Sequence, residues 1–326
     1  MSFNVHLDND ITISTGDELS LFESALKSGY TINHSCLSGR CSECKALILE
    51  GKTIALKNQE GLSQKEIDDG YCLSCVSKPI TNLKLSKLNF IEGLLPEIKT
   101  TPAKINRLHK ITNNIIKLSL RTPPGKTLKF IPGQHVDLSV KGIVRSYSIS
   151  SIPTEKEIVF YIKKYQNGKF SKYLFNEAKV NDLLRIIGPK GTYFLTKKNY
   201  KKILFLSTGT GIAPNISILK DLLMKSPSRA KDVILIHGQQ YVKDHVYELK
   251  STFPNVKIIK ATSREKSEDF FNGYVHHAAI GLGLDLKQVV VFACGNPKMI
   301  KDAKKQFMDN GLPEDKFKSD AFVESN

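Results

Sequence analysis

The sequence predicts a chain of three domains, namely a small α+β domain, an antiparallel β-barrel and a doubly wound α/β domain. Three observations predict this fold. Five of the six cysteines fall between residues 36 and 75, among short apolar segments. Short β-rich segments separated by Gly and Pro follow, as in a barrel. From residue 198 onward apolar strands alternate with helical segments, which is typical of a parallel sheet covered by helices.

The length of 326 residues allows two or three domains, each with its own core. The first domain is expected at residues 1–91. A linker is expected at residues 92–102, a stretch that carries two prolines. The barrel is then predicted at residues 103–197 and the α/β domain at residues 198–326.

The first domain is expected to be a small mixed sheet with one helix. Alternating apolar residues and turn residues predict its elements. The expected elements are a hairpin of residues 3–7 and 11–13 around Asn9-Asp10, a helix from Asp17 to Leu26, a second hairpin of residues 46–49 and 53–56 around Glu50-Gly51, and a last strand at residues 80–85.

Four cysteines of this domain follow a spacing that suits iron–sulfur chemistry. Cys36, Cys41 and Cys44 stand in the run CLSGRCSEC, and Cys75 lies in the later segment YCLSC. The C-x4-C-x2-C…C spacing resembles that of plant-type [2Fe-2S] ferredoxins. The resemblance implies a β-grasp domain in which these four thiolates bind a [2Fe-2S] cluster. Gly39 suits a loop whose backbone must approach inorganic sulfur closely.

Two other interpretations of the cysteines remain. Two C-x2-C pairs, Cys41/Cys44 and Cys72/Cys75, could form a zinc ribbon, but this leaves Cys36 unused and separates the pairs by 27 residues. A disulfide framework is not favoured, because six cysteines in 326 residues are too few for a stapled secreted fold. The ferredoxin resemblance favours Cys75 as the fourth ligand and a buried, apolar role for Cys72.

The formal net charge of +16 is unevenly distributed. It is −3 over residues 1–95, +13 over residues 96–197 and +6 over residues 198–326. The lysines of the middle region are scattered, which is typical of solvated faces, so we expect no binding of nucleic acid. A basic middle domain suits anionic cofactors and attracts the acidic first domain.

No apolar run approaches 18 residues, and the N-terminal residues lack the apolar core of a signal peptide. We therefore expect no membrane segment. Together with reduced thiols, this predicts a cytoplasmic protein.

The middle domain carries a motif of flavin-binding barrels. Arg145-Ser146-Tyr147-Ser148 matches R-x-Y-S and resembles barrels of the ferredoxin–NADP reductase type. The resemblance implies that Arg145 binds the FAD pyrophosphate, that Tyr147 lies against the isoalloxazine, and that Ser148 hydrogen-bonds near its N5 atom. A guanidinium fork suits phosphate and an aromatic wall suits a planar ring.

A second segment of the same domain, Gly168-Lys169-Phe170-Ser171, resembles the other phosphate-contacting segment of that family. Gly168 would permit close approach of the backbone. Ser171 is expected to cap a helix whose N-terminus faces an anion.

The third domain carries two turns typical of nicotinamide binding. Gly209-Thr210-Gly211 follows a strand and precedes a helix, a context in which Gly-rich turns bind dinucleotide phosphates. Cys294-Gly295 resembles the start of the family's CGPP segment, with Asn296 replacing the first proline, and this cysteine would sit beside the nicotinamide. An ordinary βα turn and a buried thiol are the plainer alternatives.

Three further residues complete the expected sites. Phe322 near the C-terminus resembles the terminal aromatic residue that covers the flavin in such reductases, although it could equally be a packing residue. Ser263 and Arg264 resemble a pair that contacts the 2′-phosphate in some NADPH enzymes. The same pair occurs in NADH-using relatives, and we favour NADH.

The three motif sets cover nearly the whole chain, which is identified as a member of the ferredoxin–NADP reductase superfamily with a fused [2Fe-2S] domain. The resemblance extends to the reductases of 3,6-dideoxyhexose (CDP-6-deoxy-glucoseen) biosynthesis and to the reductase components of phenol hydroxylase and methane monooxygenase. It implies hydride transfer from nicotinamide to FAD near Ser148 and Cys294, and then single-electron transfer to the cluster.

The resemblance also implies a separate electron-acceptor protein, and we expect the reductase to be a monomer. The dehydratase of dideoxyhexose synthesis is the first candidate acceptor, and an aromatic or alkane oxygenase component is the second. A carrier or zinc-binding scaffold without reductase activity is the alternative from another class, and the FAD and nicotinamide motifs argue against it.

Overall fold

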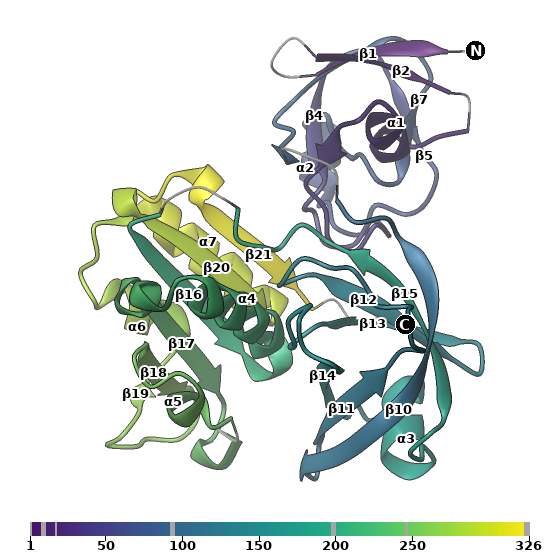
Figure 1. The fold of residues 1–326 in the computed structure, drawn as a ribbon. Helices are drawn as coiled ribbons and strands as arrows, with labels where there is room; N and C mark the ends of the chain where they lie inside the picture. The colour runs from purple at the N-terminus through teal and green to yellow at the C-terminus, as the bar shows by residue number, and fades with distance from the viewer. Residues whose placement is uncertain are drawn as a thin grey trace. The chain divides into compact units, whose positions relative to one another are not determined.

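A computed structural model describes residues 2–7, 11–16, 18–91, 95–196, 200–244 and 247–322. The chain forms two compact units, which Figure 1 shows as ribbons. The first unit comprises residues 1–96 and 190–192, and the second comprises residues 97–189 and 193–326. The chain therefore crosses between the units three times. Within the described ranges, no helix is both long and apolar enough to cross a membrane.

The first unit is built on a five-stranded sheet in the order β2-β1-β8-β4-β6. The first two strands pair antiparallel as predicted, whereas β1 and β8 pair parallel. This mixed sheet with one packed helix matches the expected β-grasp arrangement. Its strands are β1 (Phe3–Leu7), β2 (Ile11–Thr15), β4 (Lys45–Glu50), β6 (Tyr71–Leu73) and β8 (Leu83–Ser86), with short ribbons of β3 (Thr31–Ile32) with β9 (Phe90–Ile91) and β5 (Thr53–Ala55) with β7 (Ser77–Pro79).

Helix α1 (Leu21–Lys27) begins later than the predicted helix because its capping residues set the start. The Ser20 side chain accepts a hydrogen bond from the Glu23 N–H, and the Glu23 carboxylate accepts one from the Ser20 N–H at 2.9 Å. This capping box satisfies two backbone N–H groups at the end of the helix, so the helix begins directly after Ser20. Asp17 and the turn residues Asn9-Asp10 lie outside the described residues.

The predicted second hairpin is wrong. The strand β4 lies inside the sheet and pairs with β6 on one side and β8 on the other, so neither edge is open to β5. The strand β5 instead pairs with β7. The turn between β4 and β5 is held from outside, because the Lys52 N–H donates to Thr81 Oγ1 at 2.8 Å. The last predicted strand, at residues 80–85, is replaced by β8, which begins at Leu83.

The N-terminal half of the second unit is a six-stranded sheet in the order β13-β12-β15-β10-β11-β14. Its end strands β13 and β14 contact each other, so the sheet curls round towards closure, as expected for a barrel. The strand β10 already begins at Lys99, inside the stretch expected as linker. The elements are β10 (Lys99–Thr112), β11 (Ile115–Arg121), β12 (His135–Val140), β13 (Ile143–Ser148), β14 (Ile158–Lys163), α3 (Lys169–Asn176) and β15 (Leu183–Lys190).

The C-terminal half of the second unit is the predicted α/β domain. Its sheet has the order β19-β18-β17-β16-β20-β21, and every pair is parallel. The strand order reverses at β16, because β17 and β18 were added on one side and β20 on the other, and such sheets bind ligands at this point. Its elements are β16 (Lys202–Thr208), α4 (Ile212–Lys225), β17 (Val233–Gln239), α5 (Leu249–Thr252), β18 (Lys257–Thr262), β19 (Phe271–Asn272), α6 (Val275–Ile280), β20 (Val289–Gly295), α7 (Pro297–Asp309) and β21 (Phe317–Ala321).

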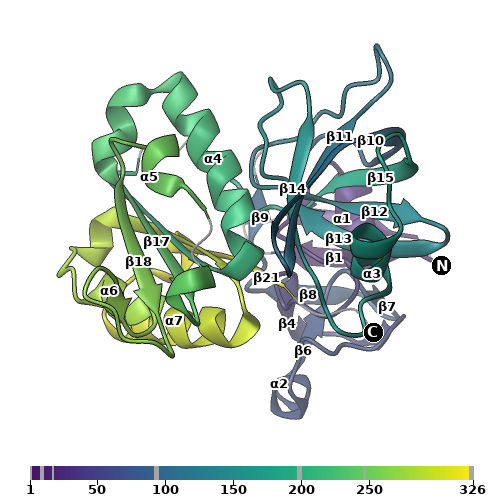
Figure 2. The ribbon, with the colours of Figure 1, turned by 90° about the horizontal axis from the view of Figure 1, so that it is seen from below.

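Both faces of this parallel sheet are buried, as its continuous apolar strands require. Phe205 points to the core under α4 and α5, whereas the adjacent Leu206 points to the core under α6 and α7. Figure 2 shows these two helix layers on opposite sides of the sheet. The half-barrel contacts helix α4 of the α/β domain, because the Ser217 hydroxyl of α4 donates to the Ser151 carbonyl at 2.6 Å.

Candidate functional site

The four cysteines expected to bind a cluster lie in two contacting pairs. Hydrogen bonding joins the thiols of Cys36 and Cys41, and likewise those of Cys44 and Cys75. The Cys36 N–H also donates to Cys41 Sγ at 3.4 Å. A [2Fe-2S] cluster takes two protein ligands on each iron. Two thiol pairs therefore fit such a cluster, with one pair for each metal ion.

A single metal ion fits this arrangement less well. In the described part of the chain, no three His, Cys, Asp or Glu side chains converge as one bound ion requires. Cys72 stays outside both thiol pairs and lies in the core, opposite Ala46 on β4. Burial raises the pKa of the Cys72 thiol to about 12.

The loop around the cysteines directs backbone N–H groups at sulfur. The N–H groups of Ser38 and Arg40 each donate to Cys36 Sγ at 3.4 Å. Together with the Cys41 thiol, these donors hold the pKa of Cys36 well below its ordinary value. Gly39, at φ +79°, is required because a Cβ atom there would lie 2.5 Å from the Asn58 carbonyl oxygen.

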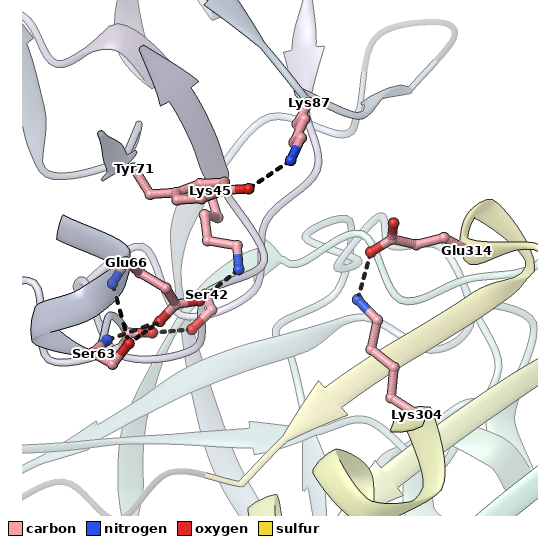
Figure 3. A network of polar contacts seen from close by, with 9 residues as sticks. Ser42, Lys45, Ser63, Glu66, Tyr71, Lys87, Lys304 and Glu314 are labelled. Carbon is pink, nitrogen blue, oxygen red and sulfur yellow. Dashed lines mark hydrogen bonds and ion pairs between the residues drawn. The ribbon is translucent and has the colours of Figure 1, made fainter. Parts of the chain in front are cut away.

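A polar network supports this loop from one side, as Figure 3 shows. The Ser42 hydroxyl donates to the carbonyl of Gly61, in the segment that leads into α2 (Gln64–Asp68). The ammonium of Lys45 lies 2.8 Å from a carboxylate oxygen of Glu66 in α2. The Glu66 carboxylate also closes the capping box with Ser63. The loop and α2 are thus fixed to each other.

The two segments expected to contact FAD lie side by side. Tyr147, on β13, packs against Phe170 at the start of α3, with ring centroids 5.3 Å apart. Arg145 precedes Tyr147 by two residues, so both side chains leave the same face of the strand. Burial raises the pKa of the Tyr147 hydroxyl well above its ordinary value. The arrangement offers a guanidinium and an aromatic wall on one surface, which fits a flavin dinucleotide.

The start of helix α3 differs from the expectation in one respect. The N-cap is Gly168, and Ser171 stands inside the first turn. The Ser171 hydroxyl donates to the Gly168 carbonyl at 3.0 Å and accepts from the Tyr165 N–H at 3.2 Å. Ser171 therefore shapes the turn and does not cap the helix. Because Gly168 provides no side-chain cap, the N–H groups of this first turn, which includes Lys169, are available to an anion.

The two nicotinamide turns are packed against each other. A Cβ atom on Gly211 would lie 2.5 Å from the Cys294 carbonyl oxygen, and one on Gly295 would lie 2.5 Å from Thr208 Oγ1. The turn of residues 209–211, which includes Thr210, therefore lies so close to the end of β20 that no side chain fits at Gly211 or Gly295. Asn296 acts as the N-cap of α7, since its side chain accepts from the Lys298 N–H at 2.8 Å. This capping role gives Asn296 a structural reason to replace the first proline of the expected CGPP segment.

Ser148 and Cys294 come close to a carboxylate that the motifs did not reveal. The Ser148 hydroxyl donates to Asp320 Oδ2 at 3.4 Å, and all three side chains are buried. Asp320 lies on β21 directly opposite Cys294 on β20. Burial, and then the charge of Asp320, raise the pKa of the Cys294 thiol far above its ordinary value. The sequence signal that could have revealed this group is Asp320 itself, a charged residue two positions before Phe322.

The remaining expected residues occupy strand ends. The Phe322 N–H donates to the Gly295 carbonyl at 2.9 Å, and its half-buried ring packs on the core under α4 and α5. Ser263 and Arg264 are exposed after β18, and their N–H groups donate to the carbonyls of Gln239 and Gln240 at 3.1 and 3.0 Å. All these residues lie near carboxyl ends of parallel strands, where a dinucleotide binds in such folds.

The second unit thus brings the residues expected at the flavin and those expected at the nicotinamide to one buried group of polar side chains. FAD, when bound, accepts a hydride and releases electrons one at a time. The residues around this buried group would orient the two rings and exclude water. Ser148 supplies a hydroxyl, Cys294 supplies a neutral thiol, and Asp320 holds the Ser148 hydroxyl in place.

Comparison with protein families gives three matches along the chain. Residues 5–79 match the 2Fe-2S iron-sulfur cluster binding domain. Residues 102–195 match the oxidoreductase FAD-binding domain, and residues 205–305 match the oxidoreductase NAD-binding domain.

Curated relatives align with nearly the whole of this chain. The chain is 36% identical over its whole length to the CDP-6-deoxy-L-threo-D-glycero-4-hexulose-3-dehydrase reductase of Yersinia pestis, all of which is covered. It is 34% identical to protein RfbI of Salmonella typhimurium over 98% of this chain and 96% of that protein. It is 29% identical to the propane 2-monooxygenase reductase component of Mycolicibacterium goodii over 96% and 95% of the two chains.

Among solved structures, the cytochrome P450 reductase GcoB of Amycolatopsis has the same fold, with a TM-score of 0.78 at 22% identity over 99% of both chains. The ferredoxin reductase of carbazole 1,9a-dioxygenase gives a TM-score of 0.70 at 24% identity, again over 99% of both chains. The chain belongs to the family of oxidoreductases that join a 2Fe-2S domain to FAD-binding and NAD-binding domains, and it is a reductase that passes electrons from NAD(P)H through FAD to a [2Fe-2S] cluster and on to a separate acceptor protein.

Proposed function

We propose that the acceptor is a dehydrase that acts on a CDP-linked 6-deoxyhexulose in dideoxyhexose synthesis. The observation that supports this proposal is the identity to the Yersinia and Salmonella reductases, which spans all three domains and exceeds the identity to the propane monooxygenase reductases. Coverage does not separate the two acceptors, since both kinds of relative align over nearly the whole chain.

Reconstitution tests the acceptor directly. The purified holoprotein is mixed under anaerobic conditions with NADH, the dehydrase of Yersinia pestis and its CDP-linked substrate. We expect NADH oxidation and deoxygenated sugar product only when all components are present. The propane 2-monooxygenase hydroxylase of Mycolicibacterium goodii serves as the matched acceptor control. Turnover with the hydroxylase and none with the dehydrase would overturn the proposal in favour of an oxygenase partner.

The site residues expected from the sequence are proposed for the relay. Cys36, Cys41, Cys44 and Cys75 hold the cluster, a role that the two contacting thiol pairs support. The flavin surface of Arg145, Tyr147 and residues 168–171 holds FAD. The nicotinamide surface consists of residues 209–211 and 294–295, with Phe322 beside it. Ser148 and Cys294 act at the reacting rings, and Asp320 positions Ser148.

NADH is proposed as the electron donor. Ser263 and Arg264 follow β18, and the neighbouring strand β17 ends at the neutral Gln239, which the neutral Gln240 follows. Glu265 directly follows Arg264, and a carboxylate in this segment disfavours a 2′-phosphate. Stopped-flow reduction of the flavin with each dinucleotide tests this. Faster reduction at lower concentration is expected with NADH, and a clear preference for NADPH would refute the proposal.

A monomeric protein of the cytoplasm is also proposed. All six cysteines are free, which suits a reducing compartment. Size-exclusion chromatography with light scattering, together with fractionation of cells that express the protein, tests both statements. A dimer, or recovery of the protein outside the cytoplasmic fraction, would contradict them.

A further inference from the structure

Three residues distant in sequence, Lys190–Thr192, belong to the same compact unit as the cluster domain. The chain enters them from β15 after Pro189 and leaves them before Tyr193. Apart from these crossings, the units are covalently joined only where the chain passes from Pro96 to Glu97. The three residues are therefore the one place where a later part of the chain returns to the cluster domain.

A dense set of hydrogen bonds holds these residues. The Thr192 N–H donates to the His34 carbonyl at 2.9 Å, and the His34 N–H donates to Thr192 Oγ1 at 2.9 Å. The Gly191 N–H donates to Nε2 of the His34 ring at 3.3 Å. His34 and Thr192 are 4% and 8% exposed, so these bonds are shielded from water. The other ring nitrogen, Nδ1, faces the Ile32 carbonyl at 2.9 Å, which fixes the ring with its proton on Nδ1.

The contact continues into the cysteine loop. The Thr192 hydroxyl is also bonded to Asn33 Oδ1, and Asn33 Nδ2 donates to Glu43 Oε2 at 2.9 Å. Glu43 stands between two of the cluster cysteines, and His34 stands two residues before Cys36. One threonine is thus linked to both ends of the loop that is expected to wrap the cluster.

We propose that Asn33, His34, Gly191 and Thr192 form a clasp, and that this clasp sets the rate at which electrons pass from FAD to the cluster. The inference rests on the established order of the relay and adds positioning residues to it. A domain attached at a single point samples many arrangements, whereas a second attachment raises its effective concentration at its partner. Thr192 is a positioning residue, because it acts through the backbone of the loop and does not contact the cluster ligands directly.

The test uses the full-length holoprotein with Thr192→Val, which keeps the shape of the side chain and removes the hydroxyl. Stopped-flow absorbance follows flavin reduction by NADH and then cluster reduction in a single turnover. We expect unchanged flavin reduction and unchanged ferricyanide reduction. Electron transfer from flavin to cluster should fall on the order of tenfold, because the effective concentration falls. Thr192→Ser keeps the hydroxyl and should restore the wild-type rate.

Thr196→Val is the matched control. Thr196 lies on the same connection between β15 and β16, and its hydroxyl meets the Tyr200 hydroxyl at 3.1 Å, away from the clasp. This variant should transfer electrons at the wild-type rate. All rates are normalised to the cluster content measured by electron paramagnetic resonance, so a loss of cluster cannot imitate slow transfer.

Two results would overturn the clasp. One is wild-type transfer in cluster-loaded Thr192→Val, and the other is an equal slowing of flavin reduction, which would place the effect in the second unit. If Thr192→Val does not assemble a cluster, Asn33→Ala tests the same contact more mildly. That variant should slow only the flavin-to-cluster step, and an unchanged rate would refute the clasp.

Discussion

The hydroxyl of Ser148 lies 3.4 Å from the carboxylate of Asp320, although the two residues are 172 positions apart in the chain. Ser148 ends the strand that carries the flavin motif, and Asp320 belongs to the last strand of the parallel sheet. The bond therefore connects the flavin half and the nicotinamide half of the second unit at a buried point. A group held in this way keeps its orientation without reorganisation during the reaction, which is how preorganised polar groups lower a barrier.

Replacing Ser148 by Ala should slow hydride transfer without preventing cofactor binding. The variant loses a hydroxyl that is expected to bond near the reacting flavin nitrogen, and such a loss costs on the order of a hundredfold in rate. Stopped-flow flavin reduction over a range of NADH concentrations separates the rate from the affinity. Ser146→Ala is the control, because Ser146 is exposed on the same strand and bonds Asp137 at 2.5 Å. An unchanged rate in Ser148→Ala would contradict the proposed role.

Sequence patterns singled out most of the residues that the candidate site contains. The thiol pairs of Cys36 with Cys41 and of Cys44 with Cys75, and the approach of Gly211 to Cys294, involve residues that the motifs contain. Their local geometry is set by turns and strand ends, which leave clear signals in residue type and spacing.

Contacts that depend on strand order were not predictable. Asp320 meets Cys294 only because β21 pairs parallel with β20 in a fixed register, and no local pattern encodes that pairing. The failed second hairpin has the same origin, since β4 is an inner strand whose two neighbours come from later in the chain. The bond between Thr192 and His34 spans 158 positions and likewise leaves no trace in either segment.

Cys294 should remain a neutral thiol through the physiological range. Burial and the charge of Asp320 both raise its pKa. A raised pKa means that the protonated form persists as the pH increases past the value at which an exposed cysteine ionises. Alkylation by iodoacetamide between pH 7 and 9, followed by mass spectrometry of the peptide around Cys294, measures this. We expect slow alkylation that does not rise with pH in the folded holoprotein.

The same peptide in denatured protein serves as the control for Cys294. Cys294 is the only cysteine beyond residue 75, so its peptide is unambiguous. In the unfolded chain, alkylation should accelerate with pH as for an ordinary thiol. Rapid alkylation of the folded protein, with a midpoint near pH 8 to 9, would show that the thiol is accessible and ionises normally.

Replacing Cys75 by Ser should remove the cluster, whereas replacing Cys72 by Ala should leave it. Cys75 contacts the thiol of Cys44, but Cys72 lies in the core as an inert side chain. Iron content, visible absorbance and reduction of cytochrome c measure the cluster, and ferricyanide reduction measures the flavin. We expect Cys75→Ser to lose the first three and to keep ferricyanide reduction. Cys72→Ala should lose only stability, roughly 1 kcal/mol, for a small cavity. The reverse pattern would identify Cys72 as the fourth ligand.

Replacing Gly211 by Ala should damage nicotinamide binding more than replacing Gly209. The added methyl group at residue 211 would stand 2.5 Å from the Cys294 carbonyl oxygen, a contact that only a shift of backbone can relieve. That shift would separate the two turns that are expected to hold the dinucleotide. At Gly209 the φ of +56° makes Ala strained, but nothing lies within 4 Å of the new atom. Left-handed strain of this kind costs about 1 to 2 kcal/mol, and it leaves the two turns in contact.

Two binding measurements test this difference between Gly211→Ala and Gly209→Ala. The dissociation constant of NAD for the oxidised holoprotein, and the NADH concentration at half-maximal flavin reduction, should both rise by an order of magnitude or more in Gly211→Ala, since each 1.4 kcal/mol of lost binding is tenfold. Both values should stay within a fewfold of wild type in Gly209→Ala. Equal effects of the two substitutions would mean that strain in the turn, and not its distance from Cys294, governs binding.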